Sequence, residues 1–542
     1  MNKEVYSAAA HAQAMRKNGF WIDRLFDDYL KENVLAVPDK LALIADSGAG
    51  QRRFTWSELG NAAARAAAAF RRMGLRRGDV VAMQTPTWWE AVVTTLACAR
   101  LGVVLNPLMT IFREYELTYM LGFAEAKVFI VPKRFSNFDF ETMANALQAK
   151  LPCIKHVIVM RGDGPNSFDK QLLDDDERPE AIRTEECPNP GELSVLMYTS
   201  GTTGSPKGVM HTDNTLVCAM NALANRCHLT SDDVVLIGAP VGHMLGFASI
   251  LLVERLGATM VLQEAWNGIR ALELTLAENV TFFSGATPHL SDLCDAAAQC
   301  KQRPSTLRLL LCAGAPIPPT LIERAAAELN LRIVSAWGMT ETLANTLTEP
   351  ERAFEKSSKT DGRPLEGSEV RVVDVEGNQV SARTVGRLMV RGAQLMLGYY
   401  KRPDIEPFDA EGWLDTGDLA FMDEEGYIRI AGRTKDLIIR GGENIPVVDI
   451  ENVLLEHPSI LAVAIVGYPD ARLGERACAF IENRPGPQFD FGELQRHMES
   501  KKVAKQFWPE KLVICETLPR TPSGKVQKFA LRERAKKEAA RS

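Results

Sequence analysis

A short loop rich in glycine and hydroxyl side chains carries the clearest chemistry in the chain. Residues 199–208 read Thr-Ser-Gly-Thr-Thr-Gly-Ser-Pro-Lys-Gly. Glycine lets the backbone approach a polyanion closely, hydroxyl groups can donate to phosphate oxygens, and a lysine adds positive charge. We therefore predict a loop that binds phosphate groups through Thr199, Ser200, Gly201, Thr202, Thr203, Gly204 and Lys207.

The surroundings of this loop decide between a binding site and a linker. The loop does not fit the G-x-x-x-x-G-K-[ST] pattern of P-loop nucleotide hydrolases. A flexible linker is the alternative, because Gly, Ser and Thr also dominate linkers. The apolar run 193–198 before the loop is typical of a buried strand, and Pro206 stiffens the turn beside Lys207. A strand followed by a fixed turn favours a binding site.

Four further motifs lie C-terminal to the loop. Residues 337–341 read Trp-Gly-Met-Thr-Glu, which we interpret as a turn, and 416–418 read Thr-Gly-Asp, which alone also fits a simple turn. Residues 432–445 read Gly-Arg-Thr-Lys-Asp-Leu-Ile-Ile-Arg-Gly-Gly-Glu-Asn-Ile, and 519–525 read Pro-Arg-Thr-Pro-Ser-Gly-Lys. Each motif could arise by chance, but their order and spacing together make an accident implausible.

This ordered set resembles the AMP-forming superfamily of acyl-CoA synthetases, adenylation domains and luciferases, over nearly the whole chain. Details at 112–117, 242–247, 285–288 and 519–531 are similar to the short- and medium-chain fatty acid and cyclohexanecarboxylate CoA ligases. The resemblance implies an ATP-dependent acid–CoA ligase with Mg²⁺ as cofactor. Carboxylate and MgATP would give acyl-adenylate and pyrophosphate, and the thiolate of CoA would then replace AMP.

The first step brings two anions together, so positive charge and fixed donors must reduce their repulsion. The resemblance assigns Lys525 to the reacting centre, although an exposed surface lysine is the alternative. Glu341 closes the 337–341 turn, and an anion near a triphosphate is explained most simply as a Mg²⁺ ligand. Trp337 stands where the family often has Tyr, and we expect no functional consequence. The resemblance places adenine and the α-phosphate beside Ala336, Trp337, Gly338, Met339 and Thr340.

Other motif residues are expected to bind ribose or to serve the second step. Asp418 can accept hydrogen bonds from ribose hydroxyls, and the resemblance places Arg433 on the opposite side of the ribose. Lys435 falls at the family's hinge, about which a C-terminal domain rotates between the two steps. The resemblance implies a CoA tunnel edged by Gly441, Gly442, Glu443 and Asn444, whereas a plain turn is the alternative for the two glycines.

The acid pocket is implied by resemblance and consists of small or apolar residues: His243, Phe247, Gly285, Ala286, Ala313, Gly314 and Ala315. The small residues leave room for a chain or ring. Residues 247–249 read Phe-Ala-Ser and offer no acidic partner to a substrate amine, which would be left unpaired in an apolar site. We expect an apolar acid, short- to medium-chain or alicyclic. His243 either gates the pocket or is a satisfied buried histidine.

The elements that must position these residues follow an alternating pattern. Apolar runs at 80–84, 236–239, 259–262, 309–312 and 332–335 alternate with helical patterns such as 57–73 and 88–101. This alternation predicts an α/β fold with helix-covered parallel sheets. From 368 onward, short strands between Gly-rich turns indicate a small antiparallel, barrel-like part. We predict an N-terminal adenylate-forming domain (1–432), a hinge (433–436) and a small mobile α+β domain (437–542) that carries Lys525.

Composition limits the partners and the compartment. The 542 residues are 46% hydrophobic and 24% charged, with a net charge of −6, which gives no general attraction to nucleic acid. Ten cysteines occur without a C-x-x-C pair, so reduced core thiols are expected. The apolar stretch 91–108 is interrupted by Arg100 and Pro107 and predicts a helix followed by a strand, not a membrane span. We expect a cytoplasmic enzyme, compatible with a homodimer.

Two other functions remain open. An adenylating enzyme could load a carrier protein in place of CoA, although the tail through 531 and the Gly-Gly-Glu-Asn-Ile segment favour CoA. A non-catalytic acyl-adenylate sensor could keep the fold without the reaction. Retention of the whole charged set argues against a sensor: Lys207, Glu341, Asp418, Arg433 and Lys525.

Overall fold

The computed structural model describes residues 8–48, 50–174, 188–199, 206–314, 317–440, 443–470, 472–487, 489–520 and 526–539. The backbone of Lys435, Glu443 and Asn444 is described without their side chains. The following predicted site residues lie outside the described residues: Ser200, Gly201, Thr202, Thr203, Gly204, Ala315, Gly441, Gly442 and Lys525.

A nine-stranded sheet runs through the middle of the molecule in the order β17-β16-β15-β14-β13-β11-β12-β1-β2. The strands from β15 to β1 are parallel, and antiparallel strands complete both edges. The bounds are β1 Leu41–Ser47, β2 Gly50–Thr55, β11 Val234–Ile237, β12 Thr259–Gln263, β13 Phe282–Gly285, β14 Leu309–Ala313, β15 Arg332–Met339, β16 Leu343–Leu347 and β17 Arg363–Pro364.

A seven-stranded sheet lies beside it in the order β20-β10-β9-β4-β3-β5-β8. Its parallel part runs from β9 to β8, and β10 and β20 extend it antiparallel. The bounds are β3 Val80–Gln84, β4 Val104–Leu108, β5 Val128–Pro132, β8 His156–Met160, β9 Leu193–Thr199, β10 Lys207–Thr212 and β20 Gly398–Tyr399. A small hairpin, β6 Arg134–Phe135 and β7 Phe138–Asp139, lies outside this sheet.

Helices cover these sheets, which explains why the parallel strands are continuous apolar runs. One large core joins α2, α3, α4, α7 and α8 to strands of both sheets, and a second core lies between the nine-stranded sheet and α9 to α11. The bounds are α1 Ala8–Lys17, α2 Phe26–Ala36, α3 Trp56–Arg72, α4 Trp89–Leu101, α5 Glu114–Ala124, α6 Phe140–Lys150, α7 Asp213–Cys227, α8 Met244–Leu256, α9 Gly268–Ala277, α10 Thr287–Cys300, α11 Pro319–Arg324 and α12 Ala353–Lys356.

The stretch 91–108 confirms the predicted helix and strand. Gly102 ends α4 in the left-handed conformation, with φ 68°, and β4 begins two residues later at Val104. A residue with a Cβ would be strained at this φ, so the glycine sets the boundary between the two elements. Among the described helices, none is both long enough and apolar enough to span a bilayer.

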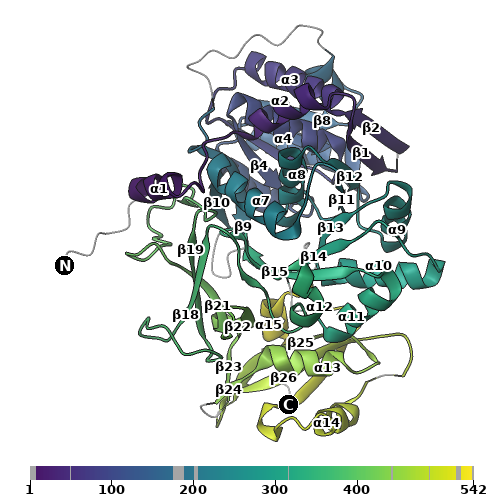
Figure 1. The fold of residues 1–542 in the computed structure, drawn as a ribbon, viewed down its shortest axis with the longest axis vertical. Coiled ribbons are helices and arrows are strands. Elements are labelled where there is room, and N and C mark those ends of the chain that lie inside the picture. The colour runs from purple at the N-terminus through teal and green to yellow at the C-terminus, as the bar shows by residue number, and fades with distance from the viewer. Residues whose placement is uncertain are drawn as a thin grey trace.

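The antiparallel part is a four-stranded sheet in the order β18-β19-β21-β22, below and to the left of the parallel sheets in Figure 1. Two of the motifs interpreted as turns belong to strands. Trp337 and Gly338 lie within β15, and residues 416–418 lie within β21, because each segment pairs with a neighbouring strand. The bounds are β18 Ser368–Val373, β19 Gly386–Gly392, β21 Leu414–Met422 and β22 Ile428–Arg433.

The C-terminal residues form a separate mixed sheet with its own cores, at the opposite end of the molecule from α2 to α4 (Figure 1). Its long hairpin β25–β26 packs against α13 and α15. The bounds are β23 Ile438–Arg440, β24 Glu443–Ile445, α13 Val447–Leu455, β25 Ile460–Asp470, β26 Gly474–Asn483, α14 Phe491–Ser500, β27 Lys511–Cys515 and α15 Lys528–Ala539.

Candidate active site

Three neighbouring parallel strands bring predicted pocket residues to one edge of the large sheet. Gly285 at the end of β13 pairs with Cys312 of β14, and Ala313 pairs with Ala336 of β15. Ligands of open α/β sheets bind beyond the carboxyl ends of the strands. The predicted acid-binding and adenine-binding residues on these strands therefore lie next to one another at the edge where a ligand is expected.

Trp337 and Asp418 connect two motifs that are 81 residues apart. The indole Nε1 of Trp337 donates a 2.9 Å hydrogen bond to Asp418 Oδ2, and both side chains are buried. Arg433 pairs with Asp418 across β21 and β22, with its Nε 3.0 Å from Oδ1. Tryptophan at position 337 therefore makes a structural contact that the sequence analysis did not predict, because its N–H is one of the groups that hold the candidate ribose carboxylate.

Gly338 is required where β15 turns back into β16. A Cβ at this position would lie 1.8 Å from the carbonyl oxygen of Leu343, so any larger residue would force the two strands apart. His211 fixes the backbone two residues after Gly338. The carbonyl of Thr340 accepts a 2.7 Å hydrogen bond from His211 Nε2 of β10. Burial lowers the pKa of His211 to about 4, so this buried ring is neutral. His211 thus fixes the chain one residue before Glu341, a role that no sequence motif indicated.

Glu341 is 6% exposed and lies between groups that can donate to it or carry positive charge. Tyr399 Oη donates a 3.1 Å hydrogen bond to Glu341 Oε1, and Lys207 Nζ lies 4.8 Å from the centre of the same tyrosine ring. Burial raises the pKa of Glu341, while the Tyr399 bond and the charges of Lys207 and Arg433 act in the opposite direction. The sequence analysis missed Tyr399, because nothing in the spacing connects it to Glu341.

The donor set around Glu341 fits Mg²⁺. Among the described residues, no group of three or more His, Cys, Asp or Glu side chains could hold a metal by itself. Magnesium bound with a nucleotide normally takes only one or two protein carboxylates, and substrate phosphates and water complete its shell. A single buried carboxylate beside Lys207 is consistent with that mode of binding.

The predicted acid-pocket residues differ from one another in burial and in the contacts that they make. His243 caps α8, with Nδ1 accepting a 3.2 Å bond from the Leu245 amide, and Phe247 is fully buried in the large core. The space beside Gly285 is already filled, because a Cβ there would lie 2.9 Å from the ring of Phe283 and 3.1 Å from His289 Cβ. Gly285 therefore permits close packing against Phe283 and His289 on the side where a Cβ would lie.

One histidine of this region, His289, has a neutral ring, which is consistent with the predicted apolar site. His289 Nδ1 accepts a 3.0 Å bond from the Ala286 amide, and burial lowers the pKa of His289 to about 4. The ring is therefore neutral near pH 7. Ala286 is buried, Ala313 is partly buried and Gly314 is exposed with φ 93°.

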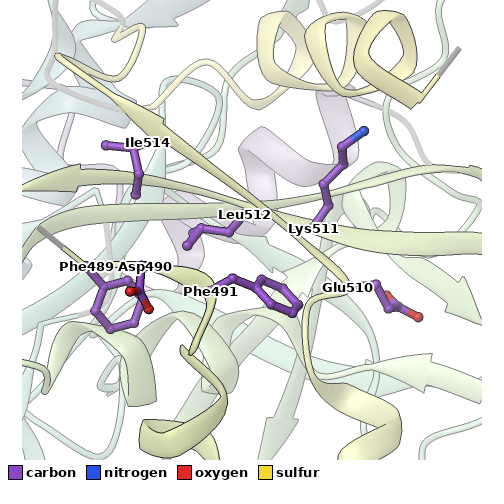
Figure 2. Close-up of a pocket in the computed structure, with 7 residues that line it drawn as sticks. All are labelled: Phe489, Asp490, Phe491, Glu510, Lys511, Leu512 and Ile514. Atoms are coloured by element: carbon purple, nitrogen blue, oxygen red, sulfur yellow. The ribbon is translucent and has the colours of Figure 1, made fainter. Parts of the chain in front are cut away.

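The predicted hinge touches the C-terminal sheet region. Arg433 ends β22, residues Thr434–Asp436 form a single 3₁₀ turn, and Asp436 makes an ion pair with Arg532 of α15. Figure 2 shows a pocket in the C-terminal region, between β27 and the start of α14. None of the predicted site residues lines it; its lining is Phe489, Asp490, Phe491, Glu510, Lys511, Leu512 and Ile514.

Comparison with known families agrees with this arrangement. Residues 30–400 match the model of the AMP-binding enzyme family, and residues 449–525 match that of the AMP-binding enzyme C-terminal domain. This chain belongs to the AMP-binding enzyme family. It is 35% identical to the medium-chain fatty-acid–CoA ligase of Escherichia coli (strain K12), an alignment that covers 96% of this chain and 92% of the relative.

Solved structures of the family have the same architecture. An anthranilate CoA ligase in complex with anthranoyl-AMP superposes with a TM-score of 0.86 at 25% identity, covering 96% of this chain and 98% of that one. The o-succinylbenzoate CoA synthetase of Bacillus subtilis, in complex with ATP and magnesium, gives 0.80 at 28% identity and covers 93% and 98%. The present family member is thus an AMP-forming acid–CoA ligase, and the predicted α/β fold with a small C-terminal α+β part is confirmed.

Proposed function

We propose that this ligase activates an apolar short- to medium-chain or alicyclic carboxylic acid with MgATP and transfers the acyl group to CoA. The observation that supports this assignment is a pair of clusters, Trp337–Asp418–Arg433 and Glu341–Tyr399–Lys207, which the segment 337–341 joins. One cluster offers a carboxylate to a ribose. The other combines a candidate metal ligand with a cation for phosphate.

In the proposed first step, a carboxylate oxygen of the acid attacks the α-phosphorus of ATP, and the bond to the β-phosphate breaks. Lys207 would bind the departing phosphates, with the loop that contains Thr199, and Lys525 would neutralise the attacking carboxylate and the α-phosphate. Bound Mg²⁺, held by Glu341, would neutralise phosphate charge. Ala336, Gly338, Met339 and Thr340 would line the adenine and the α-phosphate.

For the nucleoside, Asp418 is proposed to accept hydrogen bonds from the ribose hydroxyls. Trp337 and Arg433 already donate to one oxygen each, so the carboxylate is held in one orientation before ATP arrives. A prearranged acceptor costs little entropy on binding.

The proposed acid pocket lies at the carboxyl ends of β13 to β15 and at the start of α8, next to this nucleotide site. His243, Phe247, Ala286, Ala313 and Gly314 remain its candidate lining, with Ala315. The neutral ring of His289 and the absence of acidic side chains at 247–249 support an apolar acid. In the E. coli relative the named substrate is a medium-chain fatty acid.

In the proposed second step, the thiolate sulfur of CoA attacks the acyl carbon, and the bond to AMP breaks. The same cleft must then admit a thiol, so we propose that residues 437–542 rotate about 433–436, with Lys435 as the hinge residue. Gly441, Gly442, Glu443 and Asn444 would edge the thiol tunnel.

Cytoplasmic location is proposed because the nine described cysteines are free thiols. Homodimer formation is a further proposal, testable by light scattering on the purified chain.

The test measures AMP and acyl-CoA formation with straight-chain acids of two to twelve carbons, cyclohexanecarboxylic acid and benzoic acid, with and without CoA. A CoA-dependent maximum within the aliphatic or alicyclic acids is expected. Pyrophosphate release without acyl-CoA would instead identify a carrier protein as the acceptor. If no acid is turned over, the assignment of this site to catalysis is wrong.

A further inference from the structure

The segment 396–400 holds both charged groups of the candidate triphosphate site through its backbone. The Met396 amide donates a 2.9 Å bond to the Glu341 carbonyl, and the Tyr400 amide donates a 2.8 Å bond to the carbonyl of Gly208, the residue after Lys207. Between them, Gly398–Tyr399 forms β20, the strand that pairs with β10. One short strand therefore sets the separation of two motifs that are far apart in the sequence.

The side chain of Tyr399 adds a second connection between the same two groups. Its hydroxyl donates to Glu341 Oε1 at 3.1 Å, and its ring faces Lys207 Nζ at 4.8 Å. A hydrogen bond to a carboxylate is roughly twice as strong as a neutral one, and a lysine over an aromatic ring is held by cation–π attraction. The phenol thus orients the anion while its ring holds the cation, without joining the two in a direct ion pair.

We propose that Tyr399 is a positioning residue for the MgATP site, which keeps Glu341 correctly oriented for the metal and keeps Lys207 directed toward the phosphates. This inference rests on the proposed function, because it assumes that Glu341 binds Mg²⁺. Tyr399 itself need not touch the reacting atoms. Groups that orient a metal ligand commonly change metal affinity about tenfold or more when they are removed.

The chain contains a closely matched control. Tyr427 Oη donates a 2.6 Å bond to Glu349 Oε2, and Lys356 Nζ lies 4.5 Å from its ring centre. These are the same three residue types in the same contacts, away from the candidate site. Tyr427→Phe therefore removes an equivalent hydroxyl without touching Glu341 or Lys207.

The experiment is calorimetric titration of the full-length protein with ATP, with and without Mg²⁺, at one fixed pH. Wild type should gain affinity from Mg²⁺. Tyr399→Phe is expected to lose about tenfold of that gain and to keep nearly the same metal-free affinity for ATP. Tyr399→Leu, which also removes the ring, should weaken metal-free binding as well, and Tyr427→Phe should match wild type.

The outcomes separate this inference from the proposed function. A wild type that gains no affinity from Mg²⁺ contradicts the role of Glu341 and therefore both proposals. If wild type responds to Mg²⁺ and Tyr399→Phe responds equally, the positioning role alone is wrong. If Tyr399→Phe loses the same ATP affinity with and without Mg²⁺, Tyr399 has a structural role only and the positioning role is wrong. In a Glu341→Gln background, Tyr399→Phe should cause no further loss of the Mg²⁺-dependent gain, and a further loss would contradict the link between the two side chains.

Discussion

Trp337 Nε1 and Asp418 Oδ2 are 2.9 Å apart, so the aromatic residue of one motif fixes the carboxylate of another. The two residues lie on strands of different sheets, β15 and β21. Their hydrogen bond therefore joins the large parallel sheet to the antiparallel one at the point where a ribose is expected. Tyrosine at position 337 would present its polar atom farther from the backbone and along a different direction, so it is not equivalent here.

We predict that Trp337→Phe weakens ATP binding about tenfold, because Asp418 loses a buried, charge-assisted donor and keeps only Arg433. The KM for ATP in acid-dependent pyrophosphate exchange is the measurement. Trp508→Phe removes an indole donor that bonds to the Val503 carbonyl in the C-terminal region, and it serves as the control. An unchanged KM for ATP in Trp337→Phe would contradict the role assigned to the Trp337–Asp418 bond.

Glu341→Gln should raise the stability of the protein while it lowers Mg²⁺-dependent ATP binding. Burial raises the pKa of Glu341 above that of an exposed glutamate, so the folded protein retains a proton that the unfolded chain releases. The resulting stability is complete below the unfolded pKa and is lost as pH rises through the folded pKa, at about 1.4 kcal/mol for each unit of difference.

Without Mg²⁺, the melting temperature of Glu341→Gln should therefore exceed that of wild type by an amount that grows from pH 5 to pH 8. The same variant should lose the Mg²⁺-dependent part of ATP binding. Melting curves at both pH values test the first statement, and titration with MgATP tests the second. A variant that is less stable than wild type at pH 8 would contradict the unfavourable burial of this carboxylate.

Lys525→Ala is predicted to slow formation of the acyl-adenylate by about a hundredfold or more, because the positive charge proposed to neutralise the reacting centre is lost. Thiolysis of supplied acyl-adenylate by CoA should remain largely intact. The two half-reactions are assayed separately. Lys536→Ala removes an equal charge from an exposed pair with Glu533 in α15 and should leave both intact. Equal loss in both half-reactions would show that Lys525 does not act in the first step alone.

Glu254 offers a test of the core that is independent of the site. This side chain of α8 is buried, and neither of its carboxylate oxygens has a hydrogen-bond partner among the residues that the structure describes. Burial, together with the nearby Asp27 and Asp213, raises its pKa well above the ordinary value, and Arg100 opposes this only in part.

Because that pKa is raised, the stabilising protonated form is lost as pH rises. Glu254→Gln should therefore increase the free energy of unfolding by about 1–3 kcal/mol at pH 8 and by much less at pH 5. Chemical denaturation at the two pH values measures it. Glu32→Gln changes a 61% exposed carboxylate and should show no such pH-dependent gain. A Glu254→Gln variant that loses stability at pH 8 would indicate an ionised, compensated carboxylate.

Much of the architecture was predictable because the parallel strands are short apolar runs that only a helix-covered sheet can bury. The run 80–84 is β3, and the pattern 57–73 is α3 displaced by one residue. The positions of 337–339 and 416–418 within strands were not predictable, because glycine in a strand marks a bulge or a close approach that depends on the partner strand. Gly338 against Leu343 is such a case.

The missed residues of the site share one physical origin. Tyr399 and His211 act through contacts with Glu341 and Thr340, which lie 58 and 129 residues away in the chain. The spacing of residues within a short sequence motif cannot predict contacts between residues so far apart in the chain. Residues proposed to contact a ligand were predicted from their type and motif, whereas residues that hold them in place can be identified only once the strands are paired.

The pairing of β20 with β10 also bears on how the polypeptide acquires its shape during synthesis. Strand β1 pairs with β12, which is synthesised more than two hundred residues later. The sheet that contains β3 is completed at its edge only by residues 398 and 399. Contacts so distant in the chain make folding slow, and an incomplete sheet edge is open to association with other chains. A nascent chain that stops short of residue 400 therefore has β10 paired with β9 on one side only, and its other edge stays open to association with other chains until β20 is synthesised.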